Sequence, residues 1–192
     1  MNPESFNAAV KKALESCVSD RIRLRLAHED DAGFILGLRT DATIGVHLSP
    51  VSPDLEAQRK WMRNYAERNE RGHEHYFLIE EQGRPVGTIR MYDYNLVDRA
   101  FFWGSWVVGP GSSPACAIAS VVKLYDLGFQ TLGFLSARFR VRKDNASVLS
   151  FHRRVGAHEV GEEAGQLSFE ITASHFASTV RPRLLKLGRM LP

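Results

Sequence analysis

The 192-residue sequence has little cysteine and no long apolar run. Its two cysteines, Cys17 and Cys116, stand far apart, which excludes a disulfide framework and favours a reducing, cytoplasmic location. The first residues contain no apolar segment of signal-peptide length. No stretch reaches the roughly 18 uninterrupted apolar residues that a spanning helix requires, so we expect no association with a membrane.

Neither sign of charge dominates the sequence. The 25 Lys and Arg residues exceed the 22 Asp and Glu residues only slightly, for a formal net charge of +3. This balance does not indicate a nucleic-acid partner, although it suits a small anionic ligand. A hydrophobic content of 44% excludes a disordered or fibrous chain. The length predicts a helical extension over residues 1–20 and a single domain over residues 21–192.

No internal repeat interrupts the chain, and its hydrophobic periodicity alternates between helical and strand patterns. Helices are expected at residues 3–18, from residue 29 onward, at 54–71, 115–132 and 145–155, and near the C-terminus. Strands are expected at residues 21–27, on both sides of the turn 82–84, and at 100–108, 134–142, 158–162 and 166–171. This order predicts an α/β or α+β sheet covered on both faces, with a right-handed crossover over residues 100–142.

The small-residue loop at 109–114 joins a strand to the helix expected near Ala115. A helix N-terminus exposes N–H groups and a positive dipole end, and small side chains let a phosphate approach them. The same pattern also fits an ordinary connection. The sequence contains neither GxGxxG nor GxxxxGK[ST], which excludes a Rossmann fingerprint and a Walker loop.

A second informative segment is RVRKDNASVLSFHRRVGA, residues 140–157. Asp144 is placed to cap a helix on which Val148, His152 and Val155 share one face. A lone histidine on such a face is either a packing residue or a group that transfers protons. Elsewhere, His73 and His75 form an HEH pattern, but two imidazoles without a third ligand make a weak site, so we expect no metal.

The order of elements and these two segments resemble the GNAT superfamily of acetyl-CoA-dependent N-acetyltransferases, over about residues 21–170. The resemblance is to the branch of ribosomal-protein N-terminal acetyltransferases and amino-sugar acetyltransferases. The family motif N-x-x-A-x-x-x-Y-x-x-x-G-F aligns with Asn145, Val148, His152, Gly156 and Ala157. The segment GRPVGTIRMYDY resembles the family's second and third strands. The resemblance implies a central mixed sheet of about seven strands with helices on both faces.

The resemblance also implies acetyl-CoA as the co-substrate, without a metal. The basic residue and glycines of the family's pyrophosphate loop are replaced here by small residues, and Pro114 removes one donor. Arg142 and Lys143 would supply the missing positive charge, and a backbone N–H near Val107 or Val108 would polarise the thioester. The implied cofactor-binding residues are Val107, Val108, Ser112, Ser113, Ala115, Cys116, Ala117, Ile118, Arg142, Lys143 and Asn145.

In such enzymes the acceptor amine attacks the thioester directly, and an acid protonates the leaving thiolate. His152 stands where the family has a tyrosine, and imidazole titrates near neutrality, so this residue is the candidate acid. The base is less defined: Ser105 is placed to position a water molecule, and Asp93 is an alternative. His47 and His75 are further candidates on the acceptor side.

Aromatic residues gather in the same strands and are interpreted either as sheet core or as walls of an acceptor cleft. Tyr92, Tyr94 and Trp103 would suit a sugar ring or a nucleotide base. We therefore expect a small-molecule primary amine as the acceptor, with a nucleotide-linked amino sugar first. A protein N-terminal amine and a ligand-binding module without catalysis remain alternatives, and a homodimer is left open.

Overall fold

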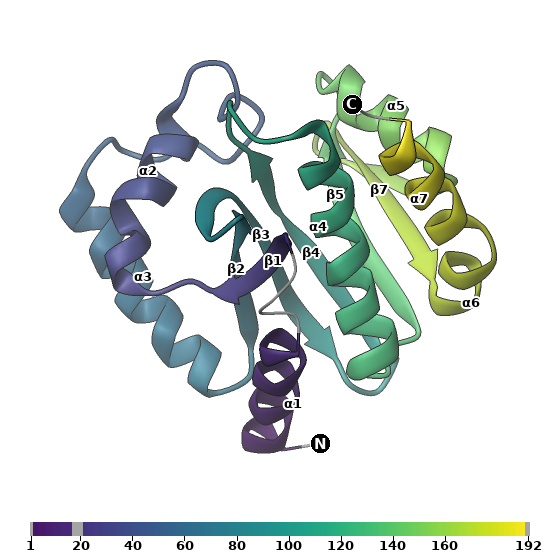
Figure 1. Cartoon of the computed structure of the whole chain (residues 1–192), viewed down its shortest axis with the longest axis horizontal. Helices are drawn as coiled ribbons and strands as arrows, with labels where there is room; N and C mark the ends of the chain where they lie inside the picture. The colour runs from purple at the N-terminus through teal and green to yellow at the C-terminus, as the bar shows by residue number, and fades with distance from the viewer. Residues whose placement is uncertain (1, 17–20, 191–192) are drawn as a thin grey trace. The chain divides into compact units, whose positions relative to one another are not determined.

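A computed structural model describes residues 2–16 and 21–190 of the chain (Figure 1). The strands form a seven-stranded mixed sheet in the order β1-β2-β3-β4-β5-β7-β6, which confirms the expected fold class. The strands are β1 (Ile22–Leu26), β2 (Glu74–Glu81), β3 (Arg84–Asn95), β4 (Ala100–Val108), β5 (Ser136–Arg142), β6 (His158–Glu163) and β7 (Gln166–Thr172). The helical segments are α1 (Pro3–Glu15), η1 (Glu29–Asp31), α2 (Ala32–Thr40), α3 (Leu55–Glu70), α4 (Pro114–Asp126), η2 (Leu127–Thr131), α5 (Ala146–Val155), α6 (Ala173–His175), η3 (Phe176–Val180) and α7 (Arg181–Arg189).

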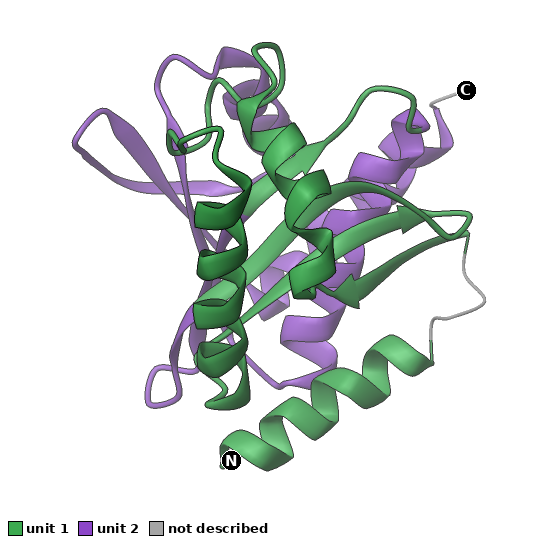
Figure 2. Cartoon of the chain, turned by 90° about the vertical axis from the view of Figure 1, so that its left-hand side faces the viewer, with its two compact units in different colours: residues 1–92, 105–112 green, residues 93–104, 113–192 purple. Residues whose placement is uncertain are grey.

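The chain divides into two compact units, which Figure 2 colours green and purple. Unit 1 comprises residues 1–92 and 105–112, and unit 2 comprises residues 93–104 and 113–192. Strands β3 and β4 each pass from one unit into the other. The first residue after each crossing point, Asp93 in β3 and Ser105 in β4, has a positive φ of 49°. A non-glycine residue adopts this left-handed conformation at a cost, so both crossings carry a local irregularity of the strand.

Unit 1 is built on the antiparallel pairs β1–β2 and β2–β3. The turn between β2 and β3 consists of Gln82 and Gly83, whose φ angles are 51° and 76°. Two consecutive positive φ angles suit the right-handed twist of the flanking strands, as the sequence predicts for this hairpin. Helices α2 and α3 pack against each other, and the apolar core of this unit lies between these helices and the sheet. Its buried members are Ala27, Ala32, Ile35, Met62, Tyr65, Tyr76 and Leu78.

Unit 2 contains the parallel pair of β4 and β5, in which residues 100–102 face residues 136–138. A parallel pair requires a crossover connection, and α4 supplies it as expected. On its other side β5 pairs with β7 in antiparallel orientation, and β7 pairs in the same way with β6. Helix α4 packs against α7, which lies beside it in Figure 1. The core of this unit is strongly aromatic, with Phe101, Trp103, Tyr125, Phe139, Phe169 and Phe176 all buried.

Three local expectations differ from the structure. The helix expected at 115–132 is α-helical only to Asp126 and continues as the π-helical turn η2. Asn145, not Asp144, caps α5, because the Asp144 carboxylate is paired at 2.6 Å with Arg142. Val148 was expected to share a face with His152 and Val155, but the buried residues of α5 are Leu149, His152 and Val155, and Val148 is half-buried. The end of the first helix expected near residue 18 and Cys17 lie outside the described residues.

Candidate active site

The C-terminal half of β4 contains Ser105, Val107 and Val108, three residues that the sequence singles out. The carbonyl oxygen of Ser105 accepts a hydrogen bond of 2.8 Å from the hydroxyl of Thr88 on β3. A Cβ atom added at Gly87 would collide with the carbonyl oxygen of Val107, so only glycine fits beside this part of β4. The backbone of β4 is therefore held closely against β3 at the left-handed residue and at Val107, two residues farther along.

The loop after β4 begins within unit 1 and has an open, small-residue backbone. Gly109 N–H donates to the carbonyl oxygen of Val86 at 2.7 Å, and Ser112 Oγ donates back to Gly109 O at 3.0 Å. Gly111 has a φ of 87° and no heavy atom within 4 Å of an added Cβ atom. One hydrogen bond to β3 and one within the loop therefore order its first residues, whereas Gly111 is surrounded by open space.

Helix α4, in unit 2, begins with Ser113 as its N-cap and Pro114 in its first turn. Proline at this position costs the helix no hydrogen bond. Cys116 N–H donates to Ser113 O at 2.9 Å, and Ala115, Ala117 and Ile118 continue the turn. No acidic residue lies in this turn. The donor set, small side chains and positive dipole end fit an anionic group such as a pyrophosphate.

The positive charges near the start of α5 are engaged with carboxylates. Arg142 pairs with Asp144, and Lys143 pairs with Glu162. All four side chains are 46–55% exposed, and exposed pairs of this kind contribute little stability, so an anion competes for the two cations at low cost. Asn145 caps the helix by accepting a hydrogen bond from Val148 N–H at 3.3 Å.

His152 lies inside the aromatic core of unit 2. Only 2% of its surface is exposed, and its ring lies 4.3 Å from that of Phe139 and 5.7 Å from that of Trp103. Burial lowers the pKa of His152 to about 3, so the imidazole is neutral near pH 7. These surroundings favour the packing interpretation of this histidine over the acid.

His75 has a comparable environment in unit 1. It is 1% exposed, and its Nε2 atom lies 3.0 Å from Asn7 Oδ1 of α1. Burial lowers its pKa to about 4. His75 thus joins the N-terminal helix to the sheet and presents no surface to an acceptor, whereas His47 is half-buried in the loop between α2 and α3.

The three aromatic residues proposed as walls of an acceptor cleft have different surroundings in the structure. Trp103 is 2% exposed and packs edge-on against Tyr125 at 5.6 Å, which favours a core role. Tyr94 is half-buried in unit 2 and stacks on Phe134 at 5.5 Å. Tyr92 is half-buried in unit 1, with the guanidinium of Arg90 at 4.7 Å from its ring centroid. Asp93, the alternative base, is exposed.

Sequence reasoning did not single out Thr88 and Arg90, which share a face of β3 with Tyr92. The sequence TIRMY could have indicated them, because polar residues occupy every second position of an otherwise apolar strand there. Polar side chains that are buried on a strand need hydrogen-bonding or ionic partners. In the structure Thr88 is hydrogen-bonded to the Ser105 carbonyl oxygen, and Arg90 is paired with Glu74.

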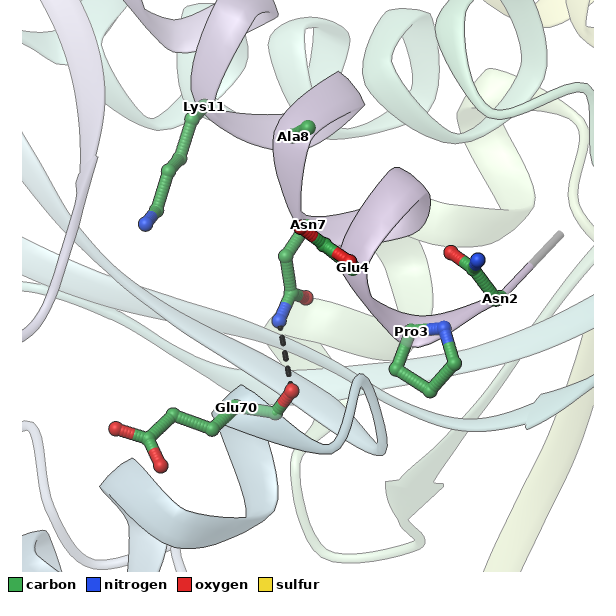
Figure 3. Close-up of a pocket in the computed structure, with 7 residues that line it drawn as sticks. All are labelled: Asn2, Pro3, Glu4, Asn7, Ala8, Lys11 and Glu70. Carbon is green, nitrogen blue, oxygen red and sulfur yellow. Dashed lines mark hydrogen bonds between the residues drawn. The ribbon is translucent and has the colours of Figure 1, made fainter.

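An open pocket of about 570 Å³ lies elsewhere, between α1 and the end of α3 (Figure 3). Figure 3 shows the side-chain amide of Asn7 donating to the carbonyl oxygen of Glu70, a bond of 3.1 Å. The pocket is lined by Asn2, Pro3, Glu4, Asn7, Ala8, Lys11 and Glu70. None of the residues singled out from the sequence lines it. We therefore interpret this pocket as a gap left where α1 packs beside the end of α3, and not as part of the active site.

Among residues 2–16 and 21–190, no group of three His, Cys, Asp or Glu side chains is arranged to hold a metal ion. Within the same ranges, no helix combines the length and hydropathy needed to cross a membrane.

A family model described as an acetyltransferase (GNAT) domain matches residues 21–158. The chain belongs to the GNAT acetyltransferase family. This confirms the family and the enzyme class that the sequence motifs predict. No curated protein sequence matches the chain.

Solved GNAT structures resemble the chain over most of its length. One described as apo FdhC, a nucleotide-linked sugar GNAT, is 32% identical with a TM-score of 0.76, and the alignment covers 90% of this chain and 96% of the other. RimJ of Mycobacterium smegmatis, in complex with CoA-disulfide, is 20% identical with a TM-score of 0.73 and coverages of 88% and 90%. A spermidine N-acetyltransferase of Vibrio cholerae, with CoA and spermine, is 17% identical with a TM-score of 0.69 and coverages of 83% and 100%. The last two similarities show the fold alone.

Proposed function

We propose that this acetyltransferase moves an acetyl group from acetyl-CoA to a primary amine of a nucleotide-linked amino sugar. The observation that carries the acceptor class is the 32% identity, over 90% of the chain, to the structure described as a nucleotide-linked sugar GNAT. The RimJ structure, which holds CoA-disulfide on the same fold, supports CoA as the carrier.

The residues expected to hold the donor suit its chemistry. The first turn of α4 contains no acidic residue, and its N–H groups that remain besides Pro114, which has none, and Cys116, which donates to Ser113 O, suit the pyrophosphate. Gly111 and Ser112 directly precede this turn in the sequence and have small side chains, and Arg142 and Lys143 are exposed cations. Acetyl-CoA, when bound, supplies the thioester that the amine attacks.

The proposed chemical roles follow from the environment of each residue. A backbone N–H at Val107 or Val108 would polarise the thioester carbonyl, because the closely held backbone of β4 costs little reorganisation. Ser105 would position the amine or a water molecule that accepts its proton, and Asp93 is the alternative. We propose a packing role for His152, since an imidazole with a pKa of about 3 carries no imidazolium proton at neutral pH.

A two-stage experiment tests the proposed function. CoA at 100 times its dissociation constant should raise the unfolding free energy by about 2.7 kcal/mol. Turnover of acetyl-CoA is then measured with a nucleotide-linked amino sugar, a ribosomal-protein N-terminal peptide and spermidine. We expect turnover with the first acceptor. Turnover with the peptide alone would show that the enzyme acetylates proteins. The absence of a thermal shift with CoA would instead favour a binding module without catalysis.

A further inference from the structure

Two arginines and two aromatic rings form a compact cluster on one face of unit 1. We call Trp61, Arg68, Glu74, Arg90 and Tyr92 the arginine–aromatic cluster. The Arg90 guanidinium lies 4.7 Å from the ring centroid of Tyr92 and 5.7 Å from that of Trp61. The Arg68 guanidinium lies 5.4 Å from the same Trp61 ring. At these distances each guanidinium group is attracted to the aromatic ring beside it by a cation–π contact.

The charge of the cluster is not balanced. Glu74 is 2% exposed and pairs with both Arg68 and Arg90, so one carboxylate serves two guanidinium groups. One positive charge therefore remains, while 36% of the Arg68 side chain and 26% of the Arg90 side chain stay exposed. Among the described residues, the buried Nε atom of Arg90 also meets no hydrogen-bond acceptor. A buried carboxylate therefore orders the cluster, and the exposed parts of the two arginine side chains keep N–H donors for an anion.

Part of the cluster lies on β3, the same strand that carries Thr88, the hydrogen-bond partner of the left-handed residue of β4. Thr88, Arg90 and Tyr92 occupy alternate positions of β3 and therefore share one face. Thr88 is bonded to Ser105 O, and the rise of a strand places Arg90 roughly 7 Å and Tyr92 roughly 13 Å farther along β3. Glu74 lies opposite Tyr92 in the register of β2 and β3, so its carboxylate belongs to the same face. A ligand with its amine at Ser105 would extend its other end over the cluster.

We propose that the arginine–aromatic cluster binds the nucleoside diphosphate part of the acceptor, with the phosphates on Arg68 and Arg90 and the base against an aromatic ring. Guanidinium groups bind phosphate oxygens in a bidentate manner, and flat aromatic faces stack on nucleobases. The proposal rests on the proposed function, because it assigns the part of the acceptor that does not react. An amino sugar without a nucleotide would leave the cluster empty.

Uridine 5′-diphosphate tests the proposal by isothermal titration, with uridine and inorganic pyrophosphate as its two fragments. All titrations are repeated with saturating CoA, because CoA also contains a nucleoside diphosphate. We expect uridine 5′-diphosphate to bind in the presence of CoA and more tightly than either fragment. The variant Arg68→Gln leaves Glu74 paired with Arg90 and should weaken binding by roughly 10- to 100-fold. Tyr92→Leu should reduce the preference for uridine 5′-diphosphate over pyrophosphate.

The matched control is Arg63→Gln, which removes a 52%-exposed guanidinium from the same helix, where it pairs with Glu29. This variant should bind uridine 5′-diphosphate like the wild type. Equal weakening in Arg63→Gln and Arg68→Gln, displacement by CoA, or no binding at millimolar concentration would each overturn the proposal. If CoA still binds and an amine is still acetylated in that case, only the cluster assignment fails. The absence of both CoA binding and turnover would instead remove the proposed function.

Discussion

The hydroxyl group of Thr88 donates a 2.8 Å hydrogen bond to the carbonyl oxygen of Ser105, the residue at which β4 adopts a left-handed backbone. Thr88 is 2% exposed, so the bond forms away from bulk water. Left-handed non-glycine residues cost about 1–3 kcal/mol and persist only where neighbouring groups hold them. The bond therefore fixes the irregular segment from which Val107 and Val108 continue.

We predict that Thr88→Val lowers both stability and turnover. The substitution keeps the branched shape but leaves the Ser105 carbonyl oxygen without its donor, which should cost about 1–3 kcal/mol of unfolding free energy. Because small displacements of reacting groups cost up to roughly 10²-fold in rate, kcat should fall beyond what the loss of folded protein explains. Chemical denaturation and turnover per folded molecule measure the two effects.

Glycine substitutions at the two left-handed residues provide the matched comparison. Ser105→Gly and Asp93→Gly relieve the same φ of 49° and should leave the unfolding free energy unchanged or slightly higher. Ser105→Gly should lower kcat, because it removes the hydroxyl group that we propose positions the amine or its proton-accepting water. A fall in kcat in Asp93→Gly alone would instead assign the base to Asp93. Equal turnover in the two variants would contradict a catalytic role for the Ser105 hydroxyl group.

We predict that the protein loses stability as the pH falls from about 6.5. Burial lowers the pKa of His152 to about 3 and that of His75 to about 4, whereas an unfolded histidine titrates near 6.5. Below pH 6.5 the unfolded chain thus binds more protons than the folded one, and each histidine lowers the unfolding free energy by about 1.4 kcal/mol per pH unit. Denaturation curves between pH 7 and pH 5 measure this slope above the range of most carboxylates.

The variant His152→Phe separates packing from acid catalysis. Phenylalanine keeps the aromatic contacts with Phe139 and Trp103 and cannot be protonated, so the slope of stability against pH should fall by about half. Turnover per folded molecule should stay close to wild type. A loss of roughly 10²- to 10⁴-fold would instead establish His152 as the general acid.

The parts of the fold that local sequence chemistry determines could be predicted. Gln82 and Gly83 supply the two positive φ angles of a tight hairpin, and Pro114 suits the first turn of α4. Periodicity could not show which aromatic residues are core, because both faces of a strand can be buried, as in β2, whose residues are all buried. Trp103 and Tyr92 therefore look alike in the sequence, although one is buried and the other lies against a guanidinium.

The candidate site was harder to predict because its residues depend on distant partners. His75 owes its burial partly to Asn7, which is 68 positions away in the sequence. Asp144 is a good N-cap by type, but its carboxylate is paired with Arg142, so Asn145 takes that role. Such competition between neighbouring groups is decided by the folded geometry and leaves no periodic signal.

We predict that Asn7→Ala destabilises the attachment of α1. The Asn7 amide donates to the carbonyl oxygens of Asn69 and Glu70, and its Oδ1 atom lies 3.0 Å from Nε2 of the buried His75. Removing this partner from a buried imidazole should lower the unfolding free energy by about 1–3 kcal/mol. Lys11→Ala, on the exposed side of the same helix, should change it by less than about 0.5 kcal/mol. Similar effects of the two variants would show that the Asn7 contacts contribute nothing specific.

We predict that Ala115→Glu abolishes CoA binding without unfolding the protein. Ala115 lies in the first turn of α4, where the N–H groups are expected to receive the pyrophosphate. A glutamate there adds bulk and a negative charge against an anionic ligand, although the helix dipole favours a carboxylate at this end by about 0.3–1 kcal/mol. The unfolding free energy without ligand should therefore be unchanged or slightly higher. Calorimetric titration with CoA measures the loss of affinity.

Ala57→Glu is the matched control, because Ala57 lies in the first turn of α3 and is exposed. This substitution introduces the same charge at the same kind of helix end, so it should reproduce the small effect on stability while leaving the CoA dissociation constant unchanged. Equal loss of affinity in both variants would point to a general electrostatic effect, which added salt should then abolish. Unchanged affinity in Ala115→Glu would show that the phosphates bind elsewhere, because a carboxylate in contact with a pyrophosphate cannot be neutral to binding.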